Sequence, residues 1–190
     1  MTYDILLAGV GGQGVLSIAT IIARAAMIDG LQVRQSEVHG MSQRGGGVQA
    51  HLRLADGPIS SDLIPSGGAD LILAMEPLES LRYLSFLKPE GALVSAAEPF
   101  VNIPDYPEPE TVYAMIRKLP DARIVAAESL AKEAGSPKSV NMVLIGAASK
   151  LLPVSGEALA RSVHDTFAAK DPRLVGINMK ALELGEKAVG

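Results

Sequence analysis

The sequence predicts an α/β fold, a Rossmann-like, doubly wound and mostly parallel sheet with helices on both faces in three layers. Short apolar strands alternate with helical segments, and the first strand runs through a glycine-rich turn into a long apolar helix. Of the 190 residues, 48% are hydrophobic but only 4% are aromatic. Such small aliphatic residues suit helices packed closely on a parallel sheet. The length suits one core, so we expect a single domain over residues 1–190.

The elements follow in order along the first half of the chain. Residues 3–8 are almost continuously apolar and predict a buried strand. Residues 13–29 predict a long helix that Gly30 ends. Residues 31–38 predict a second strand, and the alternating residues 48–54 predict a third strand with one apolar face.

The second half continues the alternation and then becomes helical. The Asp56-Gly57 pair predicts a turn, after which residues 59–65 are expected to return as a short edge segment. Residues 98–110 hold four prolines and predict a loop. The other predicted elements are strands over residues 69–75, 92–97 and 122–127, and helices over residues 76–87, 111–119, 130–134, 140–152, 157–169 and 179–189.

Composition excludes several classes of protein. The chain has no cysteine, so it holds no disulfide, cysteine-ligated zinc or iron–sulfur cluster of its own. A net charge of -4 without charge blocks argues against nucleic acid as a partner. We expect a cytoplasmic protein without membrane contact, because no basic leader precedes the first strand and the apolar residues 15–28 include Arg24.

Other polar residues receive ordinary structural interpretations. His39 and His51 lack the spacing of metal ligands, and a solvated or hydrogen-bonded histidine is the expectation for each. Four glutamates are interpreted as helix starts and solvated faces, namely Glu76, Glu79, Glu128 and Glu133.

The first candidate site is the glycine turn after the first strand. Gly9, Gly11 and Gly14 have the G-x-G-x-x-G spacing that binds the pyrophosphate of a dinucleotide between a strand and a helix. Gly12 and Gln13 lie inside the same turn, and Gln13 puts a side chain where a pyrophosphate needs room. The alternative is a tight turn whose glycines only let the helix pack on the strand, and the motif alone leaves both open.

The second candidate site is the polar segment after the second strand. Glu37 near the end of that strand is placed to hold a ribose hydroxyl. Arg44, beside three glycines, is suited to a phosphate or carboxylate, although it could instead pair with Glu37. The candidate binding residues of this segment are Glu37, His39, Ser42, Gln43, Arg44, Gly45 and Gly46.

Taken together, the two segments resemble a known family. "GVGGQGV" at 9–15 followed by "SEVHGMSQRGG" at 36–46 is similar to the gamma subunit or domain of 2-oxoacid:ferredoxin oxidoreductases. Residues 63–94 and 139–153 extend the resemblance over nearly the whole chain. Within the family it is most similar to the small subunit of the indolepyruvate branch. The resemblance implies a Rossmann-like domain that requires no nicotinamide.

The resemblance also implies a division of labour. Such enzymes decarboxylate a 2-oxoacid oxidatively on thiamine diphosphate, pass electrons through [4Fe–4S] clusters to ferredoxin and form an acyl-CoA. This chain has neither cysteines nor the family's G-D-G…N-N signature. The resemblance therefore implies that no cofactor is required in this chain. Thiamine diphosphate, Mg and the [4Fe–4S] clusters are expected on a large partner subunit, with CoA as co-substrate. We expect a hetero-oligomer whose isolated small chain could associate with itself.

The leading hypothesis is therefore a subunit of an aryl-pyruvate ferredoxin oxidoreductase that is inactive alone. Its two glycine segments would face the partner near the active-site entrance, where they hold loop geometry or touch a CoA phosphate. No catalytic residue is assigned in this chain. The alternatives are a subunit of a pyruvate or branched-chain 2-oxoacid enzyme, a stand-alone dinucleotide-binding oxidoreductase, and a regulatory module that binds a nucleotide or CoA.

Overall fold

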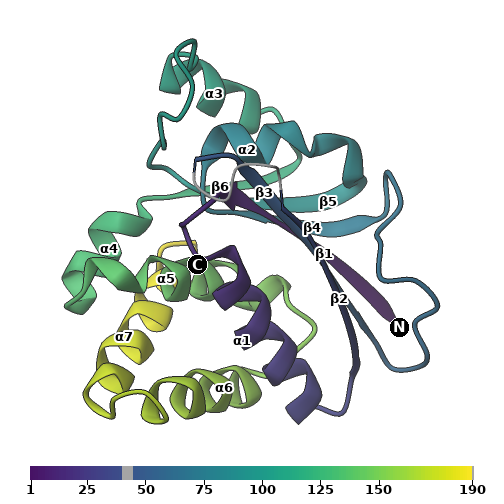
Figure 1. The fold of residues 1–190 in the computed structure, drawn as a ribbon, viewed down its shortest axis with the longest axis vertical. Coiled ribbons are helices and arrows are strands. Elements are labelled where there is room, and N and C mark those ends of the chain that lie inside the picture. The colour runs from purple at the N-terminus through teal and green to yellow at the C-terminus, as the bar shows by residue number, and fades with distance from the viewer. Residues whose placement is uncertain (40–44, 190) are drawn as a thin grey trace.

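The computed structural model describes residues 1–39 and 45–189. The strands form one six-stranded sheet in the order β2-β3-β1-β4-β5-β6 (Figure 1). Four neighbouring strands, β1, β4, β5 and β6, are parallel, whereas β3 is antiparallel to both β1 and β2. The strands are β1 (Thr2–Val10), β2 (Gln32–His39), β3 (Gly47–Ala55), β4 (Ala69–Ala74), β5 (Leu87–Ala96) and β6 (Asp121–Val125).

Helices cover both faces of this sheet and give three layers. Figure 1 shows α1, α4, α5, α6 and α7 on one side of the sheet, with α2 and α3 on the other. The predicted α/β, three-layer class is confirmed. The helices are α1 (Val15–Ile28), α2 (Pro77–Arg82), α3 (Pro109–Ile116), α4 (Ala127–Ala134), α5 (Val140–Ala148), α6 (Gly156–Ala168) and α7 (Arg173–Lys187). None of the helices in the described ranges is long and apolar enough to cross a membrane.

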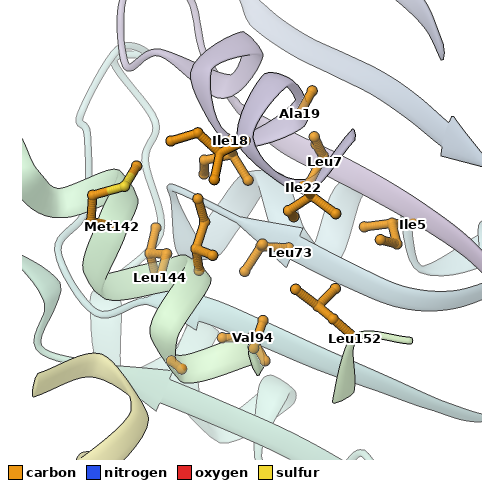
Figure 2. Close-up of a cluster of buried hydrophobic side chains, with 14 of the residues drawn as sticks. Ile5, Leu7, Ile18, Ala19, Ile22, Leu73, Val94, Met142, Leu144 and Leu152 are labelled. Carbon is orange, nitrogen blue, oxygen red and sulfur yellow. The ribbon is translucent and has the colours of Figure 1, made fainter. Parts of the chain in front are cut away.

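Strand side chains alternate between two buried clusters, one on each face of the sheet. Ile5 and Leu7 of β1 belong to the larger cluster, beneath α1 and α5, and Figure 2 shows them close to Ile22 and Leu73. Leu6 and Ala8 point to the smaller cluster beneath α2 and α3. A strand buried on both faces is continuously apolar, which explains why the first strand could be predicted from its composition.

The backbones of α5 and α7 are in direct contact within the helical layer. A Cβ atom added at Gly146 would lie 2.0 Å from the carbonyl oxygen of Leu182, and one at Gly185 would lie 1.9 Å from that of Val143. Only glycine allows two helix backbones to approach so closely. The contact fixes α7 against the layer that covers the larger cluster.

The predicted edge segment at residues 59–65 is wrong, because these residues form no strand. Side chains of β3 bind this segment instead. The Arg53 guanidinium donates to the carbonyl oxygens of Ser61 and Leu63, each at 3.1 Å. The Ile64 N–H donates to Nδ1 of His51 at 3.1 Å. His51 is therefore a buried, hydrogen-bonded histidine, as expected.

The predicted helix over residues 76–87 is too long. α2 ends at Arg82, a 3₁₀ turn covers Leu84–Phe86, and β5 begins already at Leu87. Pro89 and Gly91, expected to separate helix from strand, lie inside β5 where its register against β4 shifts. A bulge accepts such residues because it interrupts the ladder.

The predicted start of the last helix is also wrong. α7 begins at Arg173, six residues before the predicted start at residue 179. Gly176 disfavours a helix locally, and the packing against α5 overrides that preference.

Candidate functional site

The two glycine segments meet at one edge of the sheet. β1 and β2 run in the same direction, so the turn after β1 and the segment after β2 lie at the carboxyl edge, where open α/β sheets bind ligands. The Gly11 N–H donates to the carbonyl oxygen of Gly46 at 2.8 Å. Within the described residues, the two glycine segments therefore share one edge of the sheet.

Two glycines of the β1–α1 turn are required for reasons within the chain. A Cβ atom at Gly9 would lie 2.9 Å from Cγ2 of Val15 and 3.3 Å from Cβ of Met75. Gly14, the residue directly before α1, has a φ of +86°, which other residues rarely adopt. The Asn141 amide of α5 donates to the Gly14 carbonyl at 3.1 Å. The tight-turn interpretation therefore explains Gly9 and Gly14 without a ligand.

Gln13 joins the ends of two neighbouring strands. Its Oε1 accepts from the Val10 N–H at 2.7 Å, and its Nε2 donates to the Met75 carbonyl at 3.2 Å. The side chain thus bridges the ends of β1 and β4 rather than pointing freely at a ligand. Any role of Gln13 in binding stays a prediction.

A cleft of about 360 Å³ opens beside this turn, at the carboxyl ends of β4 and β5. Two carboxylates, Glu98 and Glu128, and one ammonium group, Lys138, lie on its wall, so the charged lining favours a cationic group over a phosphate. Glu98 Oε1 accepts from the Glu128 N–H at 3.0 Å, whereas its buried Oε2 accepts from no described residue. The lining comprises Gly12, Gln13, Met75, Ala96, Glu98, Pro99, Phe100, Glu128, Pro137, Lys138, Val140 and Asn141.

Glu76 is a buried carboxylate that orders the surrounding loops. It precedes α2, and its Oε2 accepts from the Glu79 N–H at 2.7 Å. Its Oε1 accepts from the Phe100 N–H at 3.3 Å and from the Tyr106 hydroxyl. Burial, together with this bond to Glu76, raises the pKa of Tyr106, so the phenol stays protonated as the donor. Glu76 therefore fixes the loop between β5 and α3.

Glu79 is a second buried carboxylate in this region. Arg82 Nε donates to its Oε2 at 3.0 Å, and a Cβ atom at Gly47 would lie 2.7 Å from the same oxygen. Burial raises the pKa of Glu79, an effect that the Arg82 charge opposes. Glu76 starts a helix as expected, but the interpretation of Glu76 and Glu79 as members of solvated faces is wrong. Glu128 and Glu133 are exposed, as expected.

The remaining residues of the second candidate site are only partly described. Glu37 is exposed on β2, and the Gln35 amide donates to its Oε1 at 2.8 Å. β3 lies between β2 and β1, so Glu37 is not on the strand beside the first turn, as a ribose-binding acid would be. His39 ends β2, Gly45 and Gly46 lead into β3, and Ser42, Gln43 and Arg44 lie outside the described residues.

The described side chains form no metal site. Residues 1–39 and 45–189 contain no group of three or more His, Cys, Asp or Glu that could hold a metal ion. The glycine backbone, the polar cleft and the fixed loop at this edge are suited to recognition.

Sequence reasoning missed the loop over residues 98–110 as part of this region. Asn102 donates to the Gly45 carbonyl at 2.7 Å, so the loop contacts the second glycine segment. No local signal in the sequence marks this contact, because Asn102 lies 57 residues after Gly45.

Comparisons with known proteins agree over almost the whole chain. The family model for pyruvate ferredoxin/flavodoxin oxidoreductase matches residues 4–188. The indolepyruvate oxidoreductase subunit IorB of Pyrococcus horikoshii is 38% identical over 98% of this chain and 95% of its own length. The subunit of the same name from Archaeoglobus fulgidus is 37% identical over 97% and 94%, respectively.

Solved structures show the same fold. The gamma subunit of a keto/oxoacid ferredoxin oxidoreductase from Geobacter sulfurreducens is 27% identical, with a TM-score of 0.72 over 98% of both chains. A 2-oxoglutarate:ferredoxin oxidoreductase from Magnetococcus marinus has a TM-score of 0.78 at 24% identity; the similarity covers 99% of this chain and 31% of that longer one. The chain belongs to the pyruvate ferredoxin/flavodoxin oxidoreductase family and has the fold of the gamma subunits.

Proposed function

We propose that the chain is the small subunit of a CoA-acylating, thiamine-diphosphate-dependent 2-oxoacid ferredoxin oxidoreductase that acts on indolepyruvate or another aryl-pyruvate. The observation that carries this proposal is the 38% identity with the indolepyruvate oxidoreductase subunit of Pyrococcus horikoshii over 98% of the chain. Three relatives named 2-oxoglutarate synthase subunit KorC are 28–29% identical to this chain, and the higher identity to the indolepyruvate subunit favours the indolepyruvate branch.

In this proposal the chain completes an active site that a large partner carries. Its own residues do not fit an iron–sulfur cluster, because the sequence has no cysteine. Thiamine diphosphate, Mg and the [4Fe–4S] clusters belong to the large subunit, which reduces ferredoxin, and CoA is a co-substrate. The cytoplasmic location and the single-domain organisation stay predictions from the sequence.

In this proposal the chain positions the loops at the active-site entrance and shields that entrance. The Gly11–Gly46 hydrogen bond joins the two glycine segments into one surface at the carboxyl edge, and Gln13 fixes the strand ends behind it. We place the partner's active-site entrance against this surface. The glycine segments would hold loop geometry there or contact a CoA phosphate.

The test is anaerobic purification of the tagged chain from its own cells, followed by assay of the material. We expect a large partner with thiamine and iron–sulfur motifs, and ferredoxin reduction that depends on indolepyruvate and CoA. Faster turnover of pyruvate or 2-oxoisovalerate would correct the substrate branch. A chain that purifies alone, binds a dinucleotide and is active would overturn the proposal.

A further inference from the structure

A second recess, of about 290 Å³, lies among the helices that cover the larger cluster in Figure 1. This helical recess is lined by parts of α1, α5, α6 and α7, and by residues that precede α5 and follow α6. The charged and hydroxyl-bearing residues of its lining are Ser17, Thr20, Lys138, Thr166 and Lys170. It adjoins the cleft beside the glycine turn, because Lys138 and Asn141 line both, but no described carboxylate lines it.

Cations without an ion pair gather at the helical recess. Most lysines and arginines of the described ranges bind a carboxylate, whereas Arg24, Lys138 and Lys170 form no ion pair with any described residue. Lys138 and Lys170 are exposed residues of the lining. Arg24 donates through Nη1 to the hydroxyl of Thr166 at 3.1 Å, so its guanidinium lies at the rim. Like charges held close together repel, and an anion bound among them relieves that repulsion.

Two carboxylates next to the helical recess are bound by other cations. Asp171, which follows Lys170 directly, pairs with Arg173 at 2.7 Å. Glu128, on the wall of the adjoining cleft, pairs with Lys132 of its own helix at 3.6 Å. The helical recess is therefore positive, although the chain as a whole has a net charge of -4.

The hydroxyl groups of the lining match a phosphate. The Ser17 hydroxyl makes no hydrogen bond within the described residues. The Thr166 hydroxyl accepts from Arg24 and keeps its own hydrogen to donate to a ligand. Phosphate oxygens accept from ammonium and hydroxyl groups, and a phosphate monoester carries nearly two negative charges at neutral pH. A carboxylate ligand would bring only one charge to three cations.

The size of the helical recess indicates that the phosphate is carried on an organic group. Its volume of about 290 Å³ is roughly ten times the share of one water molecule in the liquid. The apolar part of the lining comes from Ile21, Met142 and Phe167. The Phe167 ring centroid lies 5.7 Å from the ammonium nitrogen of Lys170, so an apolar and a charged contact stand side by side. A nucleotide, with a phosphate next to its rings, meets both.

We propose that the helical recess binds the phosphate of a nucleotide, with Lys138, Lys170 and the Ser17 hydroxyl as its donors. The site is distinct from the two glycine segments, and the inference does not depend on the proposed function. Two sources carry this chemistry. One is a free nucleotide such as AMP, and the other is CoA, whose adenosine also bears a phosphate monoester.

The first test is calorimetric titration of the full chain with AMP and with adenosine at low salt. We expect adenosine to bind at least about tenfold more weakly than AMP, because it lacks the phosphate. Lys138→Gln with Lys170→Gln should raise the dissociation constant of AMP at least about tenfold. The matched control is Lys118→Gln with Lys180→Gln, the other two described lysines that form no ion pair and that lie outside the lining. It removes the same charge and should change that constant less than about twofold.

A pair of hydroxyl variants tests the same site without changing its charge. Ser17→Ala removes the free hydroxyl and should weaken AMP binding about threefold. Thr20→Val is the control on the same helix, because the Thr20 hydroxyl already donates to the Leu16 carbonyl at 2.9 Å. It should leave AMP binding unchanged.

The outcomes either support the site or overturn it. The inference is wrong if neither AMP nor CoA binds below about 1 mM, if adenosine binds as tightly as AMP, or if the two double-lysine variants behave alike. Tighter binding of CoA than of AMP, weakened by the same variants, supports the site and identifies CoA as the source. The reverse order supports the site with a free nucleotide. A chain that binds AMP in this way but forms no active complex would overturn the proposed function and leave the site intact.

Discussion

Two glycine-rich regions of the chain meet different physical requirements. Where α5 crosses α7, Gly146 and Gly185 allow backbones to touch, and any side chain would overlap a carbonyl group. At the carboxyl edge, Gly14 supplies a left-handed φ, and Gly11 bonds the second glycine segment. The glycines at the α5–α7 crossing allow the helices to pack into one layer. The glycines at the carboxyl edge of the sheet determine the shape of the surface there. A glycine motif therefore has to be interpreted together with what each glycine contacts.

The comparison predicts the largest loss of stability at the helix crossing. Gly185→Ala places a Cβ 1.9 Å from the Val143 carbonyl oxygen, so α5 and α7 must move apart at a cost of more than about 3 kcal/mol. Gly176→Ala on the same helix is the matched control. Nothing lies within 4 Å of its Cβ, and we expect about 0.5–1 kcal/mol of stabilisation. Urea unfolding measures both, and equal effects would refute the close-contact explanation.

A second large effect is expected at the ion pair that orders the segment after β3. Arg53 donates through Nε and Nη2 to the two oxygens of the buried Asp4, at 2.8 and 3.0 Å. Arg53→Met leaves that carboxylate buried without its partner and should lower the unfolding free energy by about 3 kcal/mol. Arg34→Met removes an exposed pair with Asp62 and should cost under about 1 kcal/mol. Similar losses for the two variants would contradict this account.

The β1–α1 turn should be less sensitive than the helix crossing. Gly14→Ala forces alanine to a φ of +86°, at a cost of about 1–2 kcal/mol. Its Cβ would also meet the Asn141 amide at 2.8 Å, a flexible side chain that can move aside. Combining it with Asn141→Ala should therefore relieve part of the loss in thermal unfolding experiments. If Gly14→Ala lost as much stability as Gly185→Ala, the carboxyl edge and the α5–α7 crossing would not differ in their sensitivity to replacing glycine.

The smallest effect is a dependence on pH at Glu79. Burial raises the pKa of Glu79 in the folded chain above the ordinary glutamate value of 4.5. The folded state then binds the proton more tightly than the unfolded state. The stability that this group contributes is complete below pH 4.5 and is lost as pH rises through the folded pKa.

Glu79→Gln should remove that dependence, because the amide does not titrate. Unfolding free energies measured from pH 4 to pH 8 should therefore show the wild type losing stability relative to Glu79→Gln as pH rises. Glu133→Gln, on an exposed glutamate, is the control and should follow the wild type. A wild-type chain that gains stability relative to Glu79→Gln with rising pH would reverse the sign and contradict the burial argument.

Most of the fold could be predicted because its elements are marked locally. β1 is apolar on both faces, and β3 alternates, with Ala50, Leu52 and Leu54 buried in the larger cluster. The errors occur where distant contacts override local patterns. Residues 59–65 are bound by Arg53 and His51 rather than by a strand, and nothing in their own composition indicates that.

The candidate site was predictable in position but not in contacts. Its two glycine segments lie after strands that run in the same direction, which places them at one edge. The sequence does not show that Glu76 is buried and fixes a loop, because its partner Tyr106 lies 30 residues further along the chain. The binding roles of the glycine segments stay predictions, since close packing and backbone conformation already explain Gly9 and Gly14.

The most direct test of the account is hydrogen–deuterium exchange of this chain, alone and within the active complex. The account predicts new protection at residues 9–14, 45–47 and 97–102, and unchanged exchange at the α5–α7 crossing, which is already packed. Protection confined to α6 and α7, with the carboxyl edge unchanged, would contradict it and would place the partner on the helical face.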